Sequence, residues 1–161
     1  MSSPLPSRAR FIEQYNIALM GELHALERVS DVTREEVTSD ETRSEGKYDT
    51  RSTEASYLAR GQAWRIAQLR QLVAWADQLS TTPPSNTVVC LGSLAQIESE
   101  EIAHYFVAPA GGTRITVDEQ TVRVVSPDSP LGKALIGIGV DEDFQFESPA
   151  GTQSMCLLNL G

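Results

Sequence analysis

The stretch STTPPSN at residues 80–86 divides the chain into two halves of different texture. Consecutive prolines cannot continue a helix, and they bias the preceding residue toward extended structure. Before this stretch the apolar residues recur at helical spacing, and after it they gather in short runs rich in β-branched residues. The sequence therefore predicts a helical domain over residues 1–80, a proline-rich linker at 81–86 and a β-rich domain over 87–161.

Two stretches of the first half carry the apolar stripe of an amphipathic helix. The first stripe consists of Ile12, Tyr15, Leu19, Leu23, Leu26 and Val29, and the second of Ala55, Leu58, Ala59, Ile66, Leu69, Val73, Ala76 and Leu79. Each helix alone would expose its stripe, so we expect an antiparallel hairpin with coiled-coil packing. Trp64 and Trp75 lie in the second helix, where we expect them to pack within the protein rather than to contact a partner.

The second half consists of short runs typical of β-strands, with turn residues between them. The runs are TVVCL, LAQIE, IAHYFVA, TRITV, TVRVV, FQFES and SMCLLNL. Only LGKALIG, residues 131–137, reads as a short helix. The predicted fold class is therefore α+β, with an N-terminal helical hairpin followed by a small antiparallel β domain that has one short helix.

Charge and composition exclude several functions. The 161 residues carry a net charge of −9, and residues 81–161 hold ten acidic residues against three basic ones. Direct, sequence-specific DNA binding needs a surplus of basic residues, so we do not expect it. The two histidines and two cysteines do not have metal-ligand spacing, which argues against an intrinsic metal site. The sequence has no apolar run long enough to cross a membrane and no secretory signal, so we expect a cytoplasmic protein without membrane contact.

The segment SPDSPLGKALIGIGVDEDFQFESPAG, residues 126–151, resembles the C-terminal domain of the bacterial transcript-cleavage factors GreA and GreB. A strand leads into Ser129 and Pro130, a short helix ends in a Leu-Ile-Gly triplet, and an acidic turn, a strand and a Pro-Gly hairpin follow. The hairpin architecture of the first half extends the resemblance over nearly the whole chain, although residue identity is weaker there. The resemblance implies that the β-rich domain is FKBP-like.

The resemblance also implies a function. A Gre factor is a non-enzymatic regulator that binds RNA polymerase through its C-terminal domain and inserts its coiled coil into the secondary channel. Acidic residues at the tip help to hold a Mg²⁺ ion of the polymerase and stimulate cleavage of backtracked RNA, so nascent RNA is contacted indirectly. In this chain we assign docking to Ser129, Pro130, Tyr105 and Phe106, and the tip acids to Glu45, Asp49 and Glu54.

The tip segment RSEGKYDTRSTEASY, residues 43–57, departs from the family pattern of an Asp and a Glu three residues apart. Thr42 stands three residues before Glu45, and Arg51 stands three residues before Glu54. Asp49 lies five residues before Glu54, which on a helix turns the two side chains about 140° apart. Three alternatives remain: a cleavage-stimulating factor, a channel-binding regulator or inhibitor without cleavage activity, and a solvated turn with mixed charges.

Peptidyl-prolyl isomerase activity is a further alternative for an FKBP-like domain. Such sites are aromatic-lined pockets, and the second half has few aromatic residues, namely Tyr105, Phe106, Phe144 and Phe146. This small number of aromatic residues argues against isomerase activity.

Overall fold

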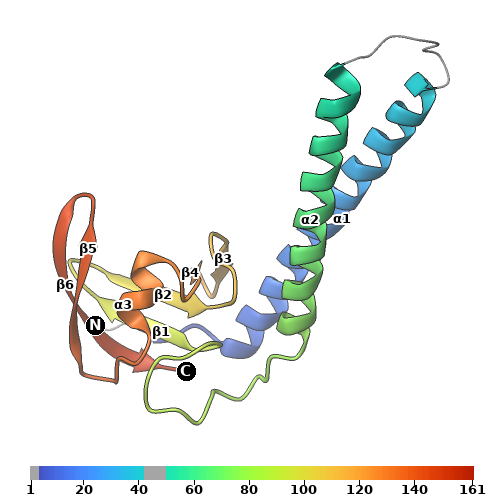
Figure 1. The fold of residues 1–161 in the computed structure, drawn as a ribbon. Coiled ribbons are helices and arrows are strands. Elements are labelled where there is room, and N and C mark those ends of the chain that lie inside the picture. The colour runs from blue at the N-terminus through green and yellow to red at the C-terminus, as the bar shows by residue number, and fades with distance from the viewer. Residues whose placement is uncertain (1–3, 42–49) are drawn as a thin grey trace. The chain divides into compact units, whose positions relative to one another are not determined.

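The computed structural model describes residues 4–41 and 50–161, with helices first and a sheet after them (Figure 1). The elements are α1 (Arg8–Glu41), α2 (Thr50–Asp77), β1 (Leu94–Glu98), β2 (Ile102–Val107), β3 (Arg114–Val117), β4 (Gln120–Val125), α3 (Pro130–Leu135), β5 (Asp143–Ser148) and β6 (Gly151–Leu160). The predicted α+β class, with two long helices before a mostly antiparallel sheet and one short helix, is confirmed.

The chain forms two compact units. One combines Met1–Tyr15 with Gln78–Gly161, and the other is Asn16–Asp77. The first turns of α1 therefore belong to the same unit as the sheet, because the boundary lies within that helix.

The sheet of the first unit has six strands in the order β3-β4-β2-β1-β6-β5. All neighbouring pairs are antiparallel except β2 and β4, which run parallel with Tyr105 opposite Arg123. The sheet is thus mostly antiparallel, as predicted, and this pair is the exception among the described strand pairs. The chain leaves β2, forms β3 at the edge and returns as β4 between them, through a two-residue turn at Asp118 and Glu119. Both turn residues have positive φ, as a type I′ hairpin requires.

One face of the sheet carries an apolar core. Because successive side chains of a strand point to opposite faces, alternate strand residues gather here against α3. The buried members are Val89, Ala95, Ile97, Tyr105, Val107, Leu135, Phe144, Met155 and Leu157. Val89 belongs to the run TVVCL, which does not form the predicted strand and makes only an isolated bridge between Val88 and Gly139.

The opposite face of the sheet is covered by the start of α1. The Phe106 ring lies 4.6 Å from that of Phe11 and 5.8 Å from that of Tyr15, measured between centroids. Arg8 Nη1 donates a hydrogen bond of 2.7 Å to the carbonyl oxygen of Gly92, and burial lowers the pKa of this guanidinium. The first two turns of α1 therefore complete the second core layer of this unit.

The second unit consists of the rest of α1 and α2, which run in opposite directions (Figure 1). The buried apolar side chains of this unit are Leu19, Leu23, Ile66, Leu69 and Ala76. Two exposed ion pairs join the helices, Arg65 with Glu22 at 2.9 Å and Arg70 with Glu27 at 2.6 Å. Such pairs contribute about 1 kcal/mol at most, so apolar burial is the main stabilising term.

Three predictions for this unit are wrong in detail. Val29 is 54% exposed, and Ser30 is buried in its place, because a residue seven positions after Leu23 stays nearly in line with it on a helix. Leu58 is 57% exposed, since eight residues turn it about 80° away from Ile66. Trp64 is 64% exposed rather than packed.

Candidate functional site

The acidic residues assigned to the tip fall near the described ends of the two long helices. Glu54 is the fifth residue of α2, and its side chain is exposed. Glu45 and Asp49 lie outside the described residues, between the end of α1 at Glu41 and the start of α2 at Thr50. The structure thus places one carboxylate of the predicted set in solvent.

The two helices are loosely packed next to this end of the hairpin. A cavity of about 250 Å³ lies between them. Its lining is mostly small and polar: Ser30, Thr33, Arg34, Ala55, Ser56, Ala59 and Gln62. Thr33 Oγ1 donates a hydrogen bond of 2.9 Å to the carbonyl oxygen of Val29 within its own helix. None of the described side chains over residues 31–36 and 54–65 is buried, so these two stretches have no apolar core between them.

The described residues contain no group of three or more His, Cys, Asp or Glu side chains placed to hold a metal ion. A carboxylate such as that of Glu54 is nevertheless a suitable ligand for Mg²⁺, which binds through one or two carboxylates together with water and phosphate oxygens. A Mg²⁺ ion bound by Glu54 would therefore need further ligands from outside the described residues. In the described part of the chain, no helix is both long enough and apolar enough to cross a membrane.

Ser129 and Pro130 begin α3. Ser129 is the N-cap: its Oγ accepts a hydrogen bond of 3.0 Å from the backbone N–H of Gly132 and donates one of 2.7 Å to the carbonyl oxygen of Ser126. Pro130 occupies the first helical position, where its missing N–H costs nothing. Gly132 is required because a Cβ there would lie 1.8 Å from the Ser126 carbonyl oxygen. The turn that presents Ser129 and Pro130 is thus held by its own hydrogen bonds.

Tyr105 and Phe106, the other two docking residues, point to opposite faces of β2. Tyr105 joins the core face and lines a cleft there. Phe106 is 0% exposed and packs against Phe11 on the other face. The structure therefore brings Tyr105 together with Ser129 but places Phe106 beneath α1.

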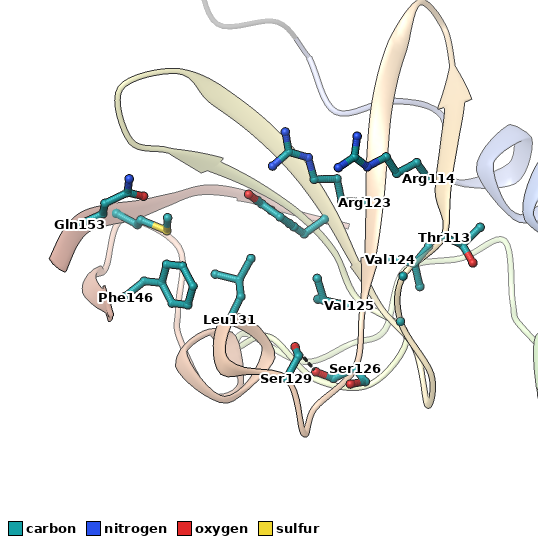
Figure 2. A pocket seen from close by; sticks show the side chains of 14 residues that line it. Thr113, Arg114, Arg123, Val124, Val125, Ser126, Ser129, Leu131, Phe146 and Gln153 are labelled. Carbon is teal, nitrogen blue, oxygen red and sulfur yellow. Dashed lines mark hydrogen bonds between the residues drawn. The ribbon is translucent and has the colours of Figure 1, made fainter. Parts of the chain in front are cut away.

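The cleft on the core face has a volume of about 530 Å³. Phe146 and Gln153 of the β5–β6 hairpin lie on one side, and Thr113 and Val124 lie on the other (Figure 2), while Met155 also lines the cleft. The remaining lining residues are Tyr105, Gly111, Gly112, Arg114, Arg123, Val125, Ser126, Ser129 and Leu131. The cleft is thus lined by both apolar and polar residues, as small-ligand sites commonly are.

Arg114 and Arg123 also line the cleft, but they were not predicted from the sequence as site residues. They are cross-strand partners on β3 and β4, and together they border both this cleft and a second hollow of about 420 Å³ next to His104. A signal was present, because residues 81–161 contain only three basic residues and two of them interrupt the apolar runs TRITV and TVRVV.

The chain is similar in sequence to a Gre-type transcription factor. Over 99 residues the chain is 27% identical to transcription elongation factor GreA 2 of Lactiplantibacillus plantarum, a match that covers 60% of this chain and 59% of that protein. The chain thus spans about three fifths of the length of the curated relative that it matches. No protein-family model matches the chain. The sequence match confirms the resemblance to the Gre factors that the motif at 126–151 predicts.

Solved structures of the same kind also align. The crystal structure of GreA factor homolog 1 of Thermus thermophilus is 19% identical, covering 91% of this chain and 94% of that one with a TM-score of 0.37. The same factor of Thermus aquaticus is 21% identical, covering 91% and 93% with a TM-score of 0.39. The GreA/GreB factor of Nitrosomonas europaea is 18% identical, covering 57% and 77% with a TM-score of 0.36.

Proposed function

We propose that this protein is a transcription elongation factor that binds bacterial RNA polymerase and does not itself catalyse a reaction. The observation that carries the proposal is the sequence match to a GreA protein, combined with two long helices that precede a six-stranded sheet. Docking is assigned to the partly exposed turn at Ser129 and Pro130 and to the neighbouring Tyr105, which is buried but lines the cleft beside this turn. The hairpin enters the secondary channel in this proposal.

The proposed chemistry at the tip is the completion of a Mg²⁺ coordination shell that the polymerase holds weakly. Two-metal phosphodiester hydrolysis uses the metal ions to stabilise both the attacking and the leaving oxygens. An exposed carboxylate at the end of a helical hairpin can supply a ligand without any pocket of its own, and Glu54 has this exposure. Asp49 and Glu45 are the other proposed ligands.

A second candidate function is channel binding without stimulation of cleavage. The spacing in the sequence favours it, because neither Glu45 nor Glu54 has an Asp three residues before it, and Thr42 and Arg51 stand there instead. In this version the protein occupies the channel and acts as a regulator or inhibitor. The two candidates share the docking surface and differ only in the effect on the transcript.

The cleft gives little support to an isomerase. Only Tyr105 and Phe146 of the four aromatic residues in the second half line it, while Phe106 faces the opposite side of the sheet and Phe144 is buried in the core. The polymerase proposal therefore remains the better explanation of this domain.

A cleavage assay on stalled elongation complexes tests the proposal. We expect the protein to co-migrate with core polymerase and to shorten backtracked RNA, and we expect Asp49→Ala and Glu54→Ala each to slow the cleavage at least tenfold without loss of binding. Glu13→Ala removes an exposed acid of α1 and serves as the matched control with unchanged activity. Binding without cleavage would establish the second candidate, and no binding at micromolar protein would contradict both.

A further inference from the structure

The cleft on the core face of the sheet has a concentrated positive charge in an otherwise acidic half of the chain. Residues 81–161 contain ten acidic residues and only three basic ones, Arg114, Arg123 and Lys133. Arg114 and Arg123 are register partners across β3 and β4, and Figure 2 shows their side chains next to each other at one end of the cleft. Two of the three basic residues of this half therefore lie at one site.

This arrangement is unfavourable for the domain alone. Like charges directly opposite each other on antiparallel strands are destabilising. Both side chains are exposed, and among the described residues neither Arg114 nor Arg123 has an ion-pair partner. An anion bound between the two guanidinium groups would relieve their repulsion and satisfy several N–H donors, since Arg pairs well with carboxylates in a bidentate geometry.

The other residues that line the cleft indicate which kind of molecule bears the anionic group. Leu131 and Phe146 point into the space beside the arginines, and Val125 and Met155 extend the apolar lining (Figure 2). Apolar lining residues beside two adjacent arginines suit a peptide that has an apolar side chain next to an acidic one. A nucleic-acid backbone is a poor fit, because the net charge of −9 repels phosphates along most of the surface.

We propose that this cleft binds an acidic and apolar peptide segment of the polymerase, with Arg114 and Arg123 pairing with its carboxylate and Leu131 and Phe146 contacting its apolar side chain. The acidic and apolar character of the peptide follows from the residues that line the cleft. Its assignment to the polymerase rests on the proposed function. The two arginines are specificity-determining residues in this scheme, beside the turn at Ser129 that the docking proposal already uses.

Peptide titration of the full chain tests the chemistry. The probe is a short blocked peptide in which Glu alternates with Leu, and the reference is the same peptide with Gln in place of Glu. In two-dimensional NMR spectra we expect the Glu peptide to shift the amide signals of Thr113, Val125 and Leu131. We expect the affinity to fall with added salt, since exposed charges are screened.

Charge-removing variants give the matched controls. The double variant Arg114→Gln and Arg123→Gln should weaken binding of the Glu peptide roughly tenfold, whereas Lys133→Gln removes the third basic residue of this half and should leave it unchanged. The double variant should unfold at the same temperature as the parent chain or a higher one, because a repulsive pair has been removed. A loss of binding then does not reflect a loss of folding.

Several results would overturn the inference. Equal binding of the Glu and Gln peptides would do so, as would equal binding by the double variant and the parent chain. Tighter, arginine-dependent binding of a single-stranded RNA oligonucleotide would reassign the site to nucleic acid. If the parent chain and the double variant both bind polymerase equally, this inference fails while the proposed function stands. If the peptide binds in an arginine-dependent way but the protein does not bind polymerase, the proposed function fails. The inferred preference of the cleft for an acidic and apolar peptide then still stands.

Discussion

A row of polar side chains crosses three strands on the second face of the sheet. Asn159 Nδ2 donates a hydrogen bond to Gln96 Oε1, and Gln96 Nε2 lies 3.3 Å from His104 Nε2. Because the Gln96 oxygen already accepts from Asn159, its amide nitrogen faces His104 as a donor. This contact suits a neutral His104 ring that accepts at Nε2, and burial lowers the pKa of His104, which also favours the neutral ring.

Stability should fall as the pH drops below the ordinary histidine range. The unfolded chain binds a proton at His104 near the usual pKa of about 6.5, whereas the folded chain binds it only at a lower pH. The stabilising contribution is thus fully present above pH 6.5, and it is lost as the pH falls from there to the folded-state pKa. Thermal unfolding measured at about pH 7.5 and pH 5.5 should show this loss.

Two substitutions isolate the effect of His104. His104→Gln should reduce the difference in unfolding temperature between the two pH values, because the titrating group is gone. His24 is exposed on α1, and His24→Gln should leave the difference as it is in the parent chain. An unchanged pH dependence in His104→Gln would show that the buried ring is not its source.

Residue spacing predicted some positions in this fold and missed others for definable reasons. Ile12, Tyr15, Leu19 and Leu23 are buried as the helical stripe required. Ser30 was missed because a small polar residue carries no hydrophobic signal, although helical geometry puts it in line with Leu23. The site residues Arg114 and Arg123 were missed because a basic residue in a strand ordinarily indicates only a solvent-facing position.

The short helix α3 depends on its cap. A six-residue helix has few internal hydrogen bonds, so the two bonds of Ser129 Oγ form a large share of its support. We expect Ser129→Ala to lower the free energy of unfolding by about 1 kcal/mol, the usual effect of losing an N-cap side chain. Denaturant unfolding followed by circular dichroism measures this change.

Ser154→Ala is the control for the cap. Ser154 is exposed on β6, and its replacement should change stability by less than about 0.5 kcal/mol. Equal stability of Ser129→Ala and the parent chain would contradict the assigned role of the Ser129 hydroxyl. The comparison also sets the baseline for docking experiments, because Ser129 belongs to the proposed docking turn and its loss must be separated from a loss of folding.

At the level of elements, periodicity identified most helices and strands but not their pairing. The predicted helix 131–137 is α3, which begins one residue earlier at Pro130 because Ser129 and Pro130 are strong local start signals and ends two residues earlier at Leu135. The parallel pairing of β2 with β4 could not be predicted, since alternation in a strand shows which side chains share a face and not which strand lies beside it. TVVCL had strand composition, but only Val88 forms a bridge.

At the level of the whole chain, the change of texture at residues 80–86 separated helix-rich from strand-rich sequence. The compact units divide differently, because residues up to Tyr15 belong with the sheet. The cause lies in three side chains, since Arg8, Phe11 and Tyr15 are buried against groups of the sheet unit such as Phe106 and Gly92. A stripe of apolar residues shows that a helix face is buried but does not reveal which element covers it.

Hydrogen exchange should reveal a gradient of stability along α2. Ile66, Leu69 and Ala76 are buried in its second half, whereas no side chain described between residues 54 and 65 is buried. Amide groups open locally where few apolar contacts hold the backbone. We therefore expect the amides of 54–65 to exchange faster than those of 66–77, after correction for intrinsic rates.

The same gradient should appear in α1, with residues 31–36 exchanging before Leu19 and Leu23, because no side chain between 31 and 36 is buried. Residues 66–77 serve as the internal control, since they belong to the same helix and contain its buried side chains. Uniform protection along α2 would contradict the expectation. A hairpin that opens first beside Glu54 can adjust the position of this carboxylate at little cost in free energy, as the proposed coordination of a metal ion held by the polymerase requires.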